Sequence, residues 1–573
     1  MNKVIDHSGQ ETAAIALAAS LKRHGVDTLF GQSLPSALHL IAPEFGMRQV
    51  NYRTENAGGV MADGYARVSN RIGVVTAQNG PAATLLVPPL AEAMKASIPL
   101  LAIVQEVDRD SKDRNAFQEF DHFSLFASCA KTIKRIDIAD RVEDYVDMAV
   151  VAATTGRPGP VVLLCPADLL RETRTSVNRR ISEMGHFPLD RVCADPDRIR
   201  EAAKLIAEAK APLVIAGGGV HLSQATEAIA RLQEIASLPI GTTNMGKGAV
   251  DETHPLSLGV LANALSKGAP AHHMRPLLDE ADLILLVGTR TNQNGTDSWK
   301  LYPPKAQFIH IDIDGTEVGR NYEALRLVGD AKLTVAALTS ALESMDLALR
   351  GQSRSPVTER IVAAKQRGRE DATYMRSTDS PLRPERIMAE IDSRLTQDTI
   401  VTADASYSSL WVSGFLTARA AGQRFITPRG LAGLGWGLPL ALGAKAAAPS
   451  SKVICVVGDG GFGHCWQELE TARRMGLHIV VILLNNGILG FQKHAELVKF
   501  GAHTNAIDFA PVDHVAIAHA TGCEGRRVET VDELSAALDA ALLHDGTTLL
   551  DVVTQADAHP PITAFENKLE IEH

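Results

Sequence analysis

The most regular pattern of apolar and polar positions lies in the C-terminal part of the chain, between Lys452 and Gly490. Val453–Val457 and Ile479–Leu484 are short, continuous apolar runs rich in β-branched residues. Such runs are typical of strands that are buried on both faces of a parallel sheet. The segment between them, Gln467–Met475, has the spacing of a helix. The pattern predicts a βαβ unit, in which ligands bind where the loops leave the carboxyl ends of the strands.

The same pattern recurs along the chain and divides it into three parts. Further buried strands are predicted at 72–76, 99–104, 161–164, 212–216, 284–288, 308–314 and 400–403. A chain of 573 residues is too long for one hydrophobic core, and Gly185–Pro196 and Leu349–Pro384 have the composition of linkers. We therefore expect an α/β protein with three doubly wound parallel-sheet domains, at residues 1–184, 196–346 and 382–573.

Two oxygen-bearing side chains follow the two strands of the C-terminal βαβ unit. Asp459 comes directly after the first strand, and Asn486 comes after the second. One carboxylate and one neutral oxygen suit a hard cation such as Mg²⁺, which completes its coordination with phosphate oxygens and water. Gly460 and Gly461 allow backbone N–H groups to approach a diphosphate at the helix start. These loops predict a site for a metal ion and a diphosphate.

A dinucleotide site is the competing interpretation of the same loop. The spacing Gly458-x-Gly460-x-x-Gly463 follows a predicted strand and opens a helix, as the dinucleotide fingerprint does. That fingerprint also expects an acidic residue about 20 positions further on, to bind the ribose. Leu477–Val480 occupies this region and contains no acid. A Gly-rich turn and an Asn turn without any ligand are a further alternative for each motif taken alone.

The residues from Gly458 to Gly460, followed by Asn485-Asn486, resemble the signature of thiamine-diphosphate-dependent enzymes. In that family the Asp, the second Asn and a main-chain carbonyl two residues later bind the Mg²⁺ that carries the cofactor's diphosphate. The resemblance therefore implies that Asp459, Asn486 and the carbonyl of Ile488 are the metal ligands.

A second segment of the chain resembles the same family. Arg53–Arg67 places Glu55 at a junction between a strand and a helix, where a lone Glu is usually a helix cap favoured by the dipole. In the family this segment carries the glutamate that bonds the aminopyrimidine ring of the cofactor, and proton transfer there needs a positioned acid–base group. Glu55 and Asp459 lie in different domains, and the family combines them across a subunit interface. The resemblance implies a homodimer or homotetramer.

Three further site residues follow from the resemblance. Gln118 stands in a Phe-Gln-Glu segment like that of acetolactate synthases and related carboligases, where the Gln lies beside the reacting carbon; a solvated turn is the alternative. Leu434 matches the aliphatic residue that holds the cofactor in its V shape, and Ala432 offers its carbonyl to the aminopyrimidine N4′. In the loop where the family often has Ser-Gly-Pro-Gly, this chain has Asn79, and that departure leaves the substrate open.

Other positions carry alternatives that the residues do not decide. The central domain of relatives holds FAD, an adenine nucleotide or nothing, and Arg290, Asp312 and Asp314 stand where such contacts occur. FAD is therefore a possible second cofactor, and glycines that serve only tight turns are the alternative. His494 is interpreted as a surface residue first, and as a polar group of the acceptor pocket second.

The resemblance covers nearly the whole chain, in the order pyrimidine-binding, central and diphosphate-binding domain. It implies thiamine-diphosphate-dependent decarboxylation of a 2-oxo acid, pyruvate in the first place, with carboligation as in acetolactate synthases. Another 2-oxo-acid decarboxylase, a lyase and a sulfoacetaldehyde-acetyltransferase-like enzyme are alternatives within the family. The joint presence of Glu55, Asp459 and Asn486 argues against a nucleotide-binding protein without thiamine chemistry.

Bulk composition excludes some partners. The net charge of −10 is spread without long blocks of one sign, which argues against nucleic acid or an anionic membrane as a partner. The six cysteines are scattered and predict neither a zinc site nor a disulfide framework. No signal core or run of about 18 apolar residues occurs. We therefore expect a cytoplasmic enzyme that acts on a small molecule.

Overall fold

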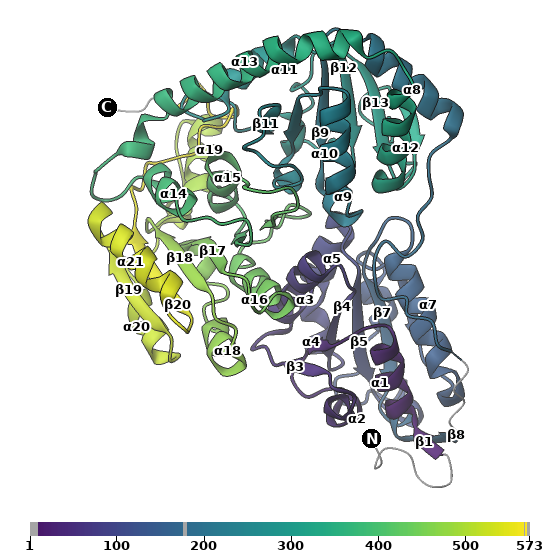
Figure 1. Ribbon diagram of the computed structural model, residues 1–573. Helices are drawn as coiled ribbons and strands as arrows, with labels where there is room; N and C mark the ends of the chain where they lie inside the picture. The colour runs from purple at the N-terminus through teal and green to yellow at the C-terminus, as the bar shows by residue number, and fades with distance from the viewer. Residues whose placement is uncertain (1–9, 176–179, 567, 570–573) are drawn as a thin grey trace.

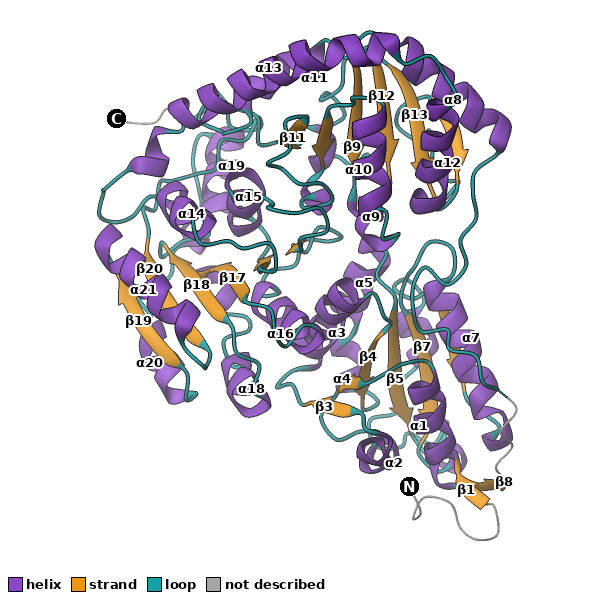
Figure 2. Ribbon diagram, viewed as in Figure 1, coloured by secondary structure: helices purple, strands orange, loops and turns teal. Residues whose placement is uncertain are grey.

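The continuous apolar runs form three parallel sheets of six strands each, and helices pack against them (Figures 1 and 2). The computed structural model describes residues 10–175, 180–566 and 568–569. Alternate residues of one strand enter different cores: Val453, Cys455 and Val457 belong to one apolar cluster, and Ile454 and Val456 belong to another. Both faces of this sheet are therefore buried, as the apolar run predicts.

The N-terminal domain has a sheet with the strand order β3-β2-β4-β5-β7-β6. Its strands are β2 (Thr28–Phe30), β3 (Arg48–Val50), β4 (Gly73–Ala77), β5 (Leu100–Glu106), β6 (Thr132–Arg135) and β7 (Val161–Pro166). Its helices are α1 (Ala13–Arg23), α2 (Ser36–Ile41), α3 (Glu55–Ser69), α4 (Pro81–Leu85), α5 (Val87–Ala96), α6 (His122–Phe126) and α7 (Val142–Thr154). A separate antiparallel pair joins β1 (Gln10–Thr12) and β8 (Thr173–Thr175).

The C-terminal domain repeats this topology, because β16-β15-β17-β18-β20-β19 is the same order when its strands are counted from β15. Its strands are β15 (Ile400–Ala403), β16 (Phe425–Ile426), β17 (Val453–Gly458), β18 (Val480–Asn485), β19 (Glu524–Val528) and β20 (Thr548–Val553). Its helices are α14 (Pro384–Asp392), α15 (Tyr407–Phe415), α16 (Gly437–Ala447), α17 (Asp459–Phe462), α18 (Glu468–Met475), α19 (Gly490–Phe500), α20 (His514–Ala520) and α21 (Val531–Leu543).

The central domain has a different order, β11-β10-β9-β12-β13-β14. Its strands are β9 (Pro212–Ala216), β10 (Ile240–Thr242), β11 (Ser257–Val260), β12 (Leu283–Val287), β13 (Gln307–Asp312) and β14 (Leu325–Val328). Its helices are α8 (Pro196–Glu208), α9 (Gly218–Leu222), α10 (Thr226–Ile235), α11 (Arg275–Asp279) and α12 (Ala331–Glu343). The direction of the strand order reverses between β9 and β12, and crevices at such points bind ligands in open sheets.

The segment Leu349–Pro384, which has the composition of a linker, is helical for most of its length, and the sequence analysis did not predict that helix. Residues Ala348–Asp371 form the 24-residue helix α13, which arches over the central domain in Figure 1. Only four of its residues are buried, namely Arg350, Ile361, Ala364 and Gly368. Because the helix is polar on nearly all sides, it lacks the apolar stripe by which a sequence reveals a helix.

Helices α3 and α16 bring the N-terminal and C-terminal domains into direct backbone contact, with two glycines at the crossing (Figure 1). A Cβ atom at Gly443 would lie 1.9 Å from the carbonyl oxygen of Met61, and one at Gly64 would lie 2.4 Å from that of Leu440. The small residues of α3 and α16 therefore allow the two backbones to approach closely. Because α3 begins at Glu55, the crossing also fixes the position of this predicted site residue.

We expect Gly443→Ala to destabilise the protein by about 1–3 kcal/mol, because the added methyl group overlaps the backbone of α3. Differential scanning calorimetry of the purified protein measures the effect. Gly351→Ala is the matched control, since Gly351 lies inside α13 with no atom within 4 Å of an added Cβ. That change should leave stability equal or higher, because Ala favours helix. Equal melting temperatures for the two variants would contradict the packing argument.

Candidate active site

A small pocket opens at the carboxyl ends of β15, β17, β18 and β20, with a volume of 70 Å³. It is lined by six residues that the sequence predicted for the site: Leu434, Asp459, Gly460, Gly461, Asn486 and Ile488. Adjacent strands of a parallel sheet bring their loops to one edge, and this places residues from both halves of the βαβ unit together.

Asp459 joins the two loops that carry the predicted metal ligands. Its carboxylate accepts hydrogen bonds from the N–H of Gly460, at 3.0 Å, and from the N–H of Gly487, at 2.7 Å. The side-chain oxygen of Asn486 accepts from the N–H of Ile488 at 3.2 Å. Burial raises the pKa of Asp459, while the two backbone hydrogen bonds oppose the shift. A cation would further favour the charged form.

The oxygen atoms at this edge fit a hard cation that is completed by phosphate. Among the residues that the structure describes, no group of three or more His, Cys, Asp or Glu side chains is suited to hold a metal ion. A site built from Asp459, Asn486 and a carbonyl therefore needs oxygens from a ligand, as Mg²⁺ usually does. Ile488 forms a β-bridge with Asp508. The two hydrogen bonds of this bridge involve the N–H of Leu489 and the carbonyl of Gly487, so neither of them uses the carbonyl of Ile488.

The loop between β16 and α16 is held by two buried carboxylates that the sequence reasoning did not identify. Asp404 accepts from the N–H groups of Gly435 (2.9 Å), Trp436 (3.0 Å) and Gly437 (3.3 Å), and thereby caps α16. A Cβ atom at Gly461 would lie 1.9 Å from the Asp404 carboxylate, so packing alone requires glycine there. Burial raises the pKa of Asp404 against these hydrogen bonds.

Glu92 of α5 holds the first part of the same loop. Its carboxylate accepts from the N–H groups of Gly430 (2.7 Å), Leu431 and Ala432 (3.3 Å). Ala432 has a φ of 62°, in the left-handed region that a residue with a side chain seldom adopts. Ala432 lines a second cavity, which borders the central domain, whereas Leu434 lines the small pocket around Asp459.

Glu55 is the first residue of α3 and is partly buried. The N-cap is its neighbour Thr54, whose side chain accepts from the N–H of Ala57. Glu468 of α18 accepts from the N–H groups of Arg53 and Thr54 at 3.1–3.2 Å and so ties this turn to the C-terminal domain. Neither Glu55 nor any other described residue before Pro384 lines the pocket around Asp459. Within one chain, Glu55 and Asp459 are therefore not brought together in that pocket.

Gln118 lies in the loop between β5 and α6 and is partly buried. The side chain of Gln78 donates to its amide oxygen at 2.7 Å. The aromatic residues on either side of Gln118 are exposed, with 83% of Phe117 and 52% of Phe120 accessible. Gln118 therefore lies between two exposed aromatic rings in a loop of the N-terminal domain, and it does not line the pocket around Asp459.

The first interpretation of His494, as a surface residue, was wrong. It is 4% exposed on α19, and its Nδ1 forms a hydrogen bond of 2.7 Å with the hydroxyl of Tyr407, which lines the pocket. The rings of Phe491, His559 and Phe565 lie around this pair. Burial, with smaller contributions from His559 and Lys493, lowers the pKa of His494 to about 4.

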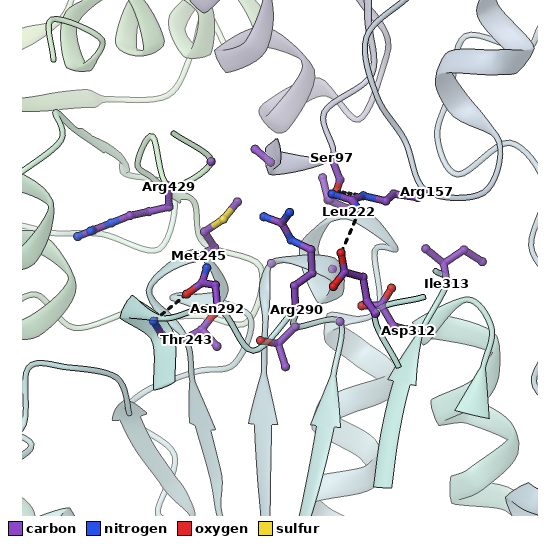
Figure 3. A pocket seen from close by; sticks show the side chains of 18 of the residues that line it. Ser97, Arg157, Leu222, Thr243, Met245, Arg290, Asn292, Asp312, Ile313 and Arg429 are labelled. Carbon is purple, nitrogen blue, oxygen red and sulfur yellow. Dashed lines mark hydrogen bonds and ion pairs between the residues drawn. The ribbon is translucent and has the colours of Figure 1, made fainter. Parts of the chain in front are cut away.

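A second and larger cavity, of 310 Å³, lies where β9 and β12 meet in the central domain (Figure 3). Arg290 points into it, and no described residue accepts a hydrogen bond or forms an ion pair with its side chain. Burial lowers the pKa of Arg290, and the nearby Arg157 lowers it further. Arg157 is itself paired with Asp314 and Glu317.

Comparison with known proteins identifies relatives of all three domains. Residues 11–125 match the thiamine pyrophosphate enzyme N-terminal TPP binding domain, 199–338 match the central domain, and 404–552 match the C-terminal TPP binding domain. A probable acetolactate synthase large subunit of Methanococcus aeolicus is 33% identical over 94% of this chain and 91% of its own. The acetolactate synthase isozyme 2 large subunit of Escherichia coli is 30% identical over 93% and 94%. In the part of the chain that the structure describes, no helix has the length and hydropathy needed to cross a membrane.

We expect His494 to make the protein less stable in acid. Its folded pKa of about 4 lies below the ordinary 6.5, so the unfolded chain takes up a proton first as the pH falls. The contribution of the neutral ring is complete above pH 6.5 and is lost as the pH falls toward 4, which amounts to about 2 kcal/mol by pH 5. Urea unfolding at pH 7.5 and pH 5 should therefore show a smaller decrease for His494→Gln than for the unchanged protein. The exposed His519 provides the control: His519→Gln should leave the decrease unchanged, and an equal decrease in all three proteins would contradict the assignment.

Proposed function

Because the chain belongs to the thiamine pyrophosphate (thiamine diphosphate) enzyme family, in its acetolactate-synthase-like branch, we propose that it decarboxylates pyruvate and joins the remaining two-carbon unit to a second carbonyl compound. The observation that carries this proposal is the joining of the two loops of the βαβ unit by Asp459, with Asn486 and Ile488 lining the same pocket. Relatives named acetolactate synthase support pyruvate as the substrate.

Each loop residue has a defined task in this proposal. Asp459, Asn486 and the carbonyl of Ile488 would hold Mg²⁺, and Gly460 and Gly461 would admit the diphosphate. Thiamine diphosphate, when bound, supplies the carbon nucleophile and the electron sink that decarboxylation of a 2-oxo acid requires. The protein supplies binding, orientation and control of protons.

Glu55, Leu434 and Ala432 would act on the ring end of the cofactor. Glu55 would hold a proton at a nitrogen of the aminopyrimidine ring, which is acid–base work for a positioned carboxyl group. Leu434 would support the bent shape of the cofactor, and Ala432 would offer its carbonyl to the ring amino group. The brace from Glu92 supports this role for Ala432, because it fixes the loop before any ligand arrives.

We propose that two chains share each site, in a homodimer or a homotetramer. Within one chain no described residue of the N-terminal domain lines the pocket around Asp459, yet one cofactor must reach both Glu55 and the metal. The exposed rings of Phe117 and Phe120 beside Gln118 support burial of this surface against a second copy.

For the central cavity we propose FAD or an adenine nucleotide. Arg290 points into the cavity and has no described partner, and a guanidinium in that situation suits a diphosphate. The glycines at the ends of β9 and β12 have a packing reason of their own, since a Cβ at Gly217 would lie 2.3 Å from the carbonyl oxygen of Gly288. The visible spectrum of the purified protein distinguishes a flavin from a colourless nucleotide.

Cytoplasmic location remains a prediction from the sequence.

Glu55→Gln should lower the formation of acetolactate from pyruvate by about 10²- to 10⁴-fold, because the amide cannot exchange the proton. The assay is product analysis with added thiamine diphosphate, Mg²⁺ and pyruvate. Glu227→Gln is the control, since Glu227 lies in the first turn of α10 and is exposed. If the Glu55 variant forms acetolactate as fast as the unchanged protein, Glu55 is not a catalytic residue. Decarboxylation without acetolactate by the unchanged protein would assign it to another branch of the family.

Asp459→Ala should abolish the Mg²⁺-dependent retention of thiamine diphosphate, because the variant loses both a carboxylate ligand and the bond that joins the two loops. Equilibrium dialysis with and without Mg²⁺ measures the retained cofactor. Asp532→Ala is the control, because Asp532 is an exposed residue in the first turn of α21. Retention equal to that of the control would exclude Asp459 as a ligand.

A further inference from the structure

Two neighbouring amide side chains, Gln78 and Asn79, stand at the carboxyl end of β4 and have no task in the proposed function so far. Gln78 donates from its amide nitrogen to the amide oxygen of Gln118 at 2.7 Å. Asn79 is 4% exposed, and its amide nitrogen donates to the carbonyls of Phe117 (3.2 Å) and Gln118 (2.9 Å). The two residues therefore hold the side chain and the backbone of Gln118 respectively.

The backbone of Gln118 needs such support. Its φ of 60° lies in the left-handed region, which costs a residue with a side chain about 1–2 kcal/mol. The loop before it has two more residues of this kind, Asp113 and Asn115. A Cβ atom at Gly80 would lie 2.7 Å from the Gln118 carbonyl oxygen, so the two loops are in direct contact. Asn79 thus holds a strained segment at the point where it meets the next loop.

A buried chain of polar groups supports the other side of the Gln78–Gly80 turn. The N–H of Gly80 donates to Nε2 of His122 at 3.1 Å, so this nitrogen carries no proton. The proton of the neutral ring is therefore on Nδ1, which lies 3.2 Å from the Glu106 carboxylate. Arg135 donates to both oxygens of Glu106. Burial alone would raise the pKa of Glu106, but hydrogen bonds from His122 and Arg135 more than offset it, and the pKa is lowered.

These contacts fix which end of the Gln118 side-chain amide is used within the protein and which end is left for a ligand. Its oxygen accepts from Gln78, and no described residue accepts from its nitrogen. The N–H groups of Gln118 are therefore the groups available to a ligand. An amide donor aimed at an oxygen that gains negative charge during reaction lowers the barrier, as the donors of an oxyanion hole do.

We propose that Gln78 and Asn79 are positioning residues that hold Gln118 with its N–H groups toward the substrate carbonyl oxygen on which negative charge develops during carbon–carbon bond formation. This inference rests on the proposed function, and it assigns Gln118 the role of a hydrogen-bond donor. Gln78 sets which end of the amide faces the substrate, and Asn79 sets where the amide stands. Neither residue touches the substrate in this arrangement.

The clamp by Asn79 is tested on the protein without cofactor, by hydrogen–deuterium exchange of peptides that cover residues 113–121. Asn79→Asp keeps the size of the side chain but replaces both N–H donors with an oxygen that repels the two carbonyls. We expect at least about tenfold faster exchange in this segment, in line with the loss of local stability. Peptides from β12 should exchange as before, which shows that the variant is folded. Unchanged exchange at 113–121 would overturn the clamp, whatever reaction the enzyme catalyses.

The polarity of Gln118 is tested by turnover of pyruvate. Gln78→Glu offers the Gln118 amide only an acceptor, so the amide must turn its nitrogen away from the substrate. We expect kcat to fall about 10- to 100-fold, with KM for pyruvate and the Kd of thiamine diphosphate unchanged, because only charge stabilisation in the transition state is lost. Gln78→Met, which removes the donor without inverting it, should cost less. Gln366→Glu on the exposed face of α13 is the control and should be active.

A double-mutant cycle separates positioning from a direct role. If Gln78 acts only through Gln118, adding Gln78→Glu to a Gln118→Leu protein should cause no further loss of kcat. Additive losses, or an active Gln78→Glu enzyme, would overturn the assignment. If the protein without any substitution binds no thiamine diphosphate, the proposed function is refuted. The exchange experiment on the apoprotein would still show whether Asn79 holds the segment 113–121.

Discussion

The structure of the site depends on backbone N–H groups that donate to buried carboxylates. Glu92 and Asp404 hold the loop that runs into α16 from its two ends, and each accepts from three N–H groups of that loop. Burial of a carboxylate is unfavourable, and it raises the pKa of both residues. The hydrogen bonds offset this cost only while the loop keeps its position. Because Glu92 belongs to the N-terminal domain, the loop is fixed only when α3 and α16 are packed together.

Much of the fold could be predicted from the sequence, since parallel strands buried on both faces appear as continuous apolar runs. The run at Val453–Val457 forms β17, and the run at Ile479–Leu484 forms β18 with a shift of one residue. Helix α13 could not be found in this way, because it has only four buried residues and contains Pro356. Its position comes from contacts with distant segments, such as the hydrogen bonds from Lys365 to the carbonyls of Glu252 and His254.

The site residues that could be predicted lie close together in the sequence, whereas those that could not be predicted depend on contacts between distant segments. Asp459, Asn486 and Ile488 belong to one βαβ unit, where spacing along the chain sets spacing in space. Glu92 meets the loop at Gly430 from more than three hundred residues away, and no local pattern records that contact. The burial of His494 could not be predicted either, because its partner Tyr407 approaches from another strand end and is 87 residues away along the chain.

Backbone strain and its compensation follow one design in both halves of the site. Ala432 and Gln118, which the proposal places next to the reacting groups, both have positive φ. Each is held by a side chain from another segment, Glu92 for Ala432 and Asn79 for Gln118. A strained conformation persists only where the surroundings over-determine it, so these braces set the geometry before a ligand binds. Since each brace lies within one chain, each half of the proposed site is formed in the single subunit, and the proposed assembly would have only to bring two prepared surfaces together.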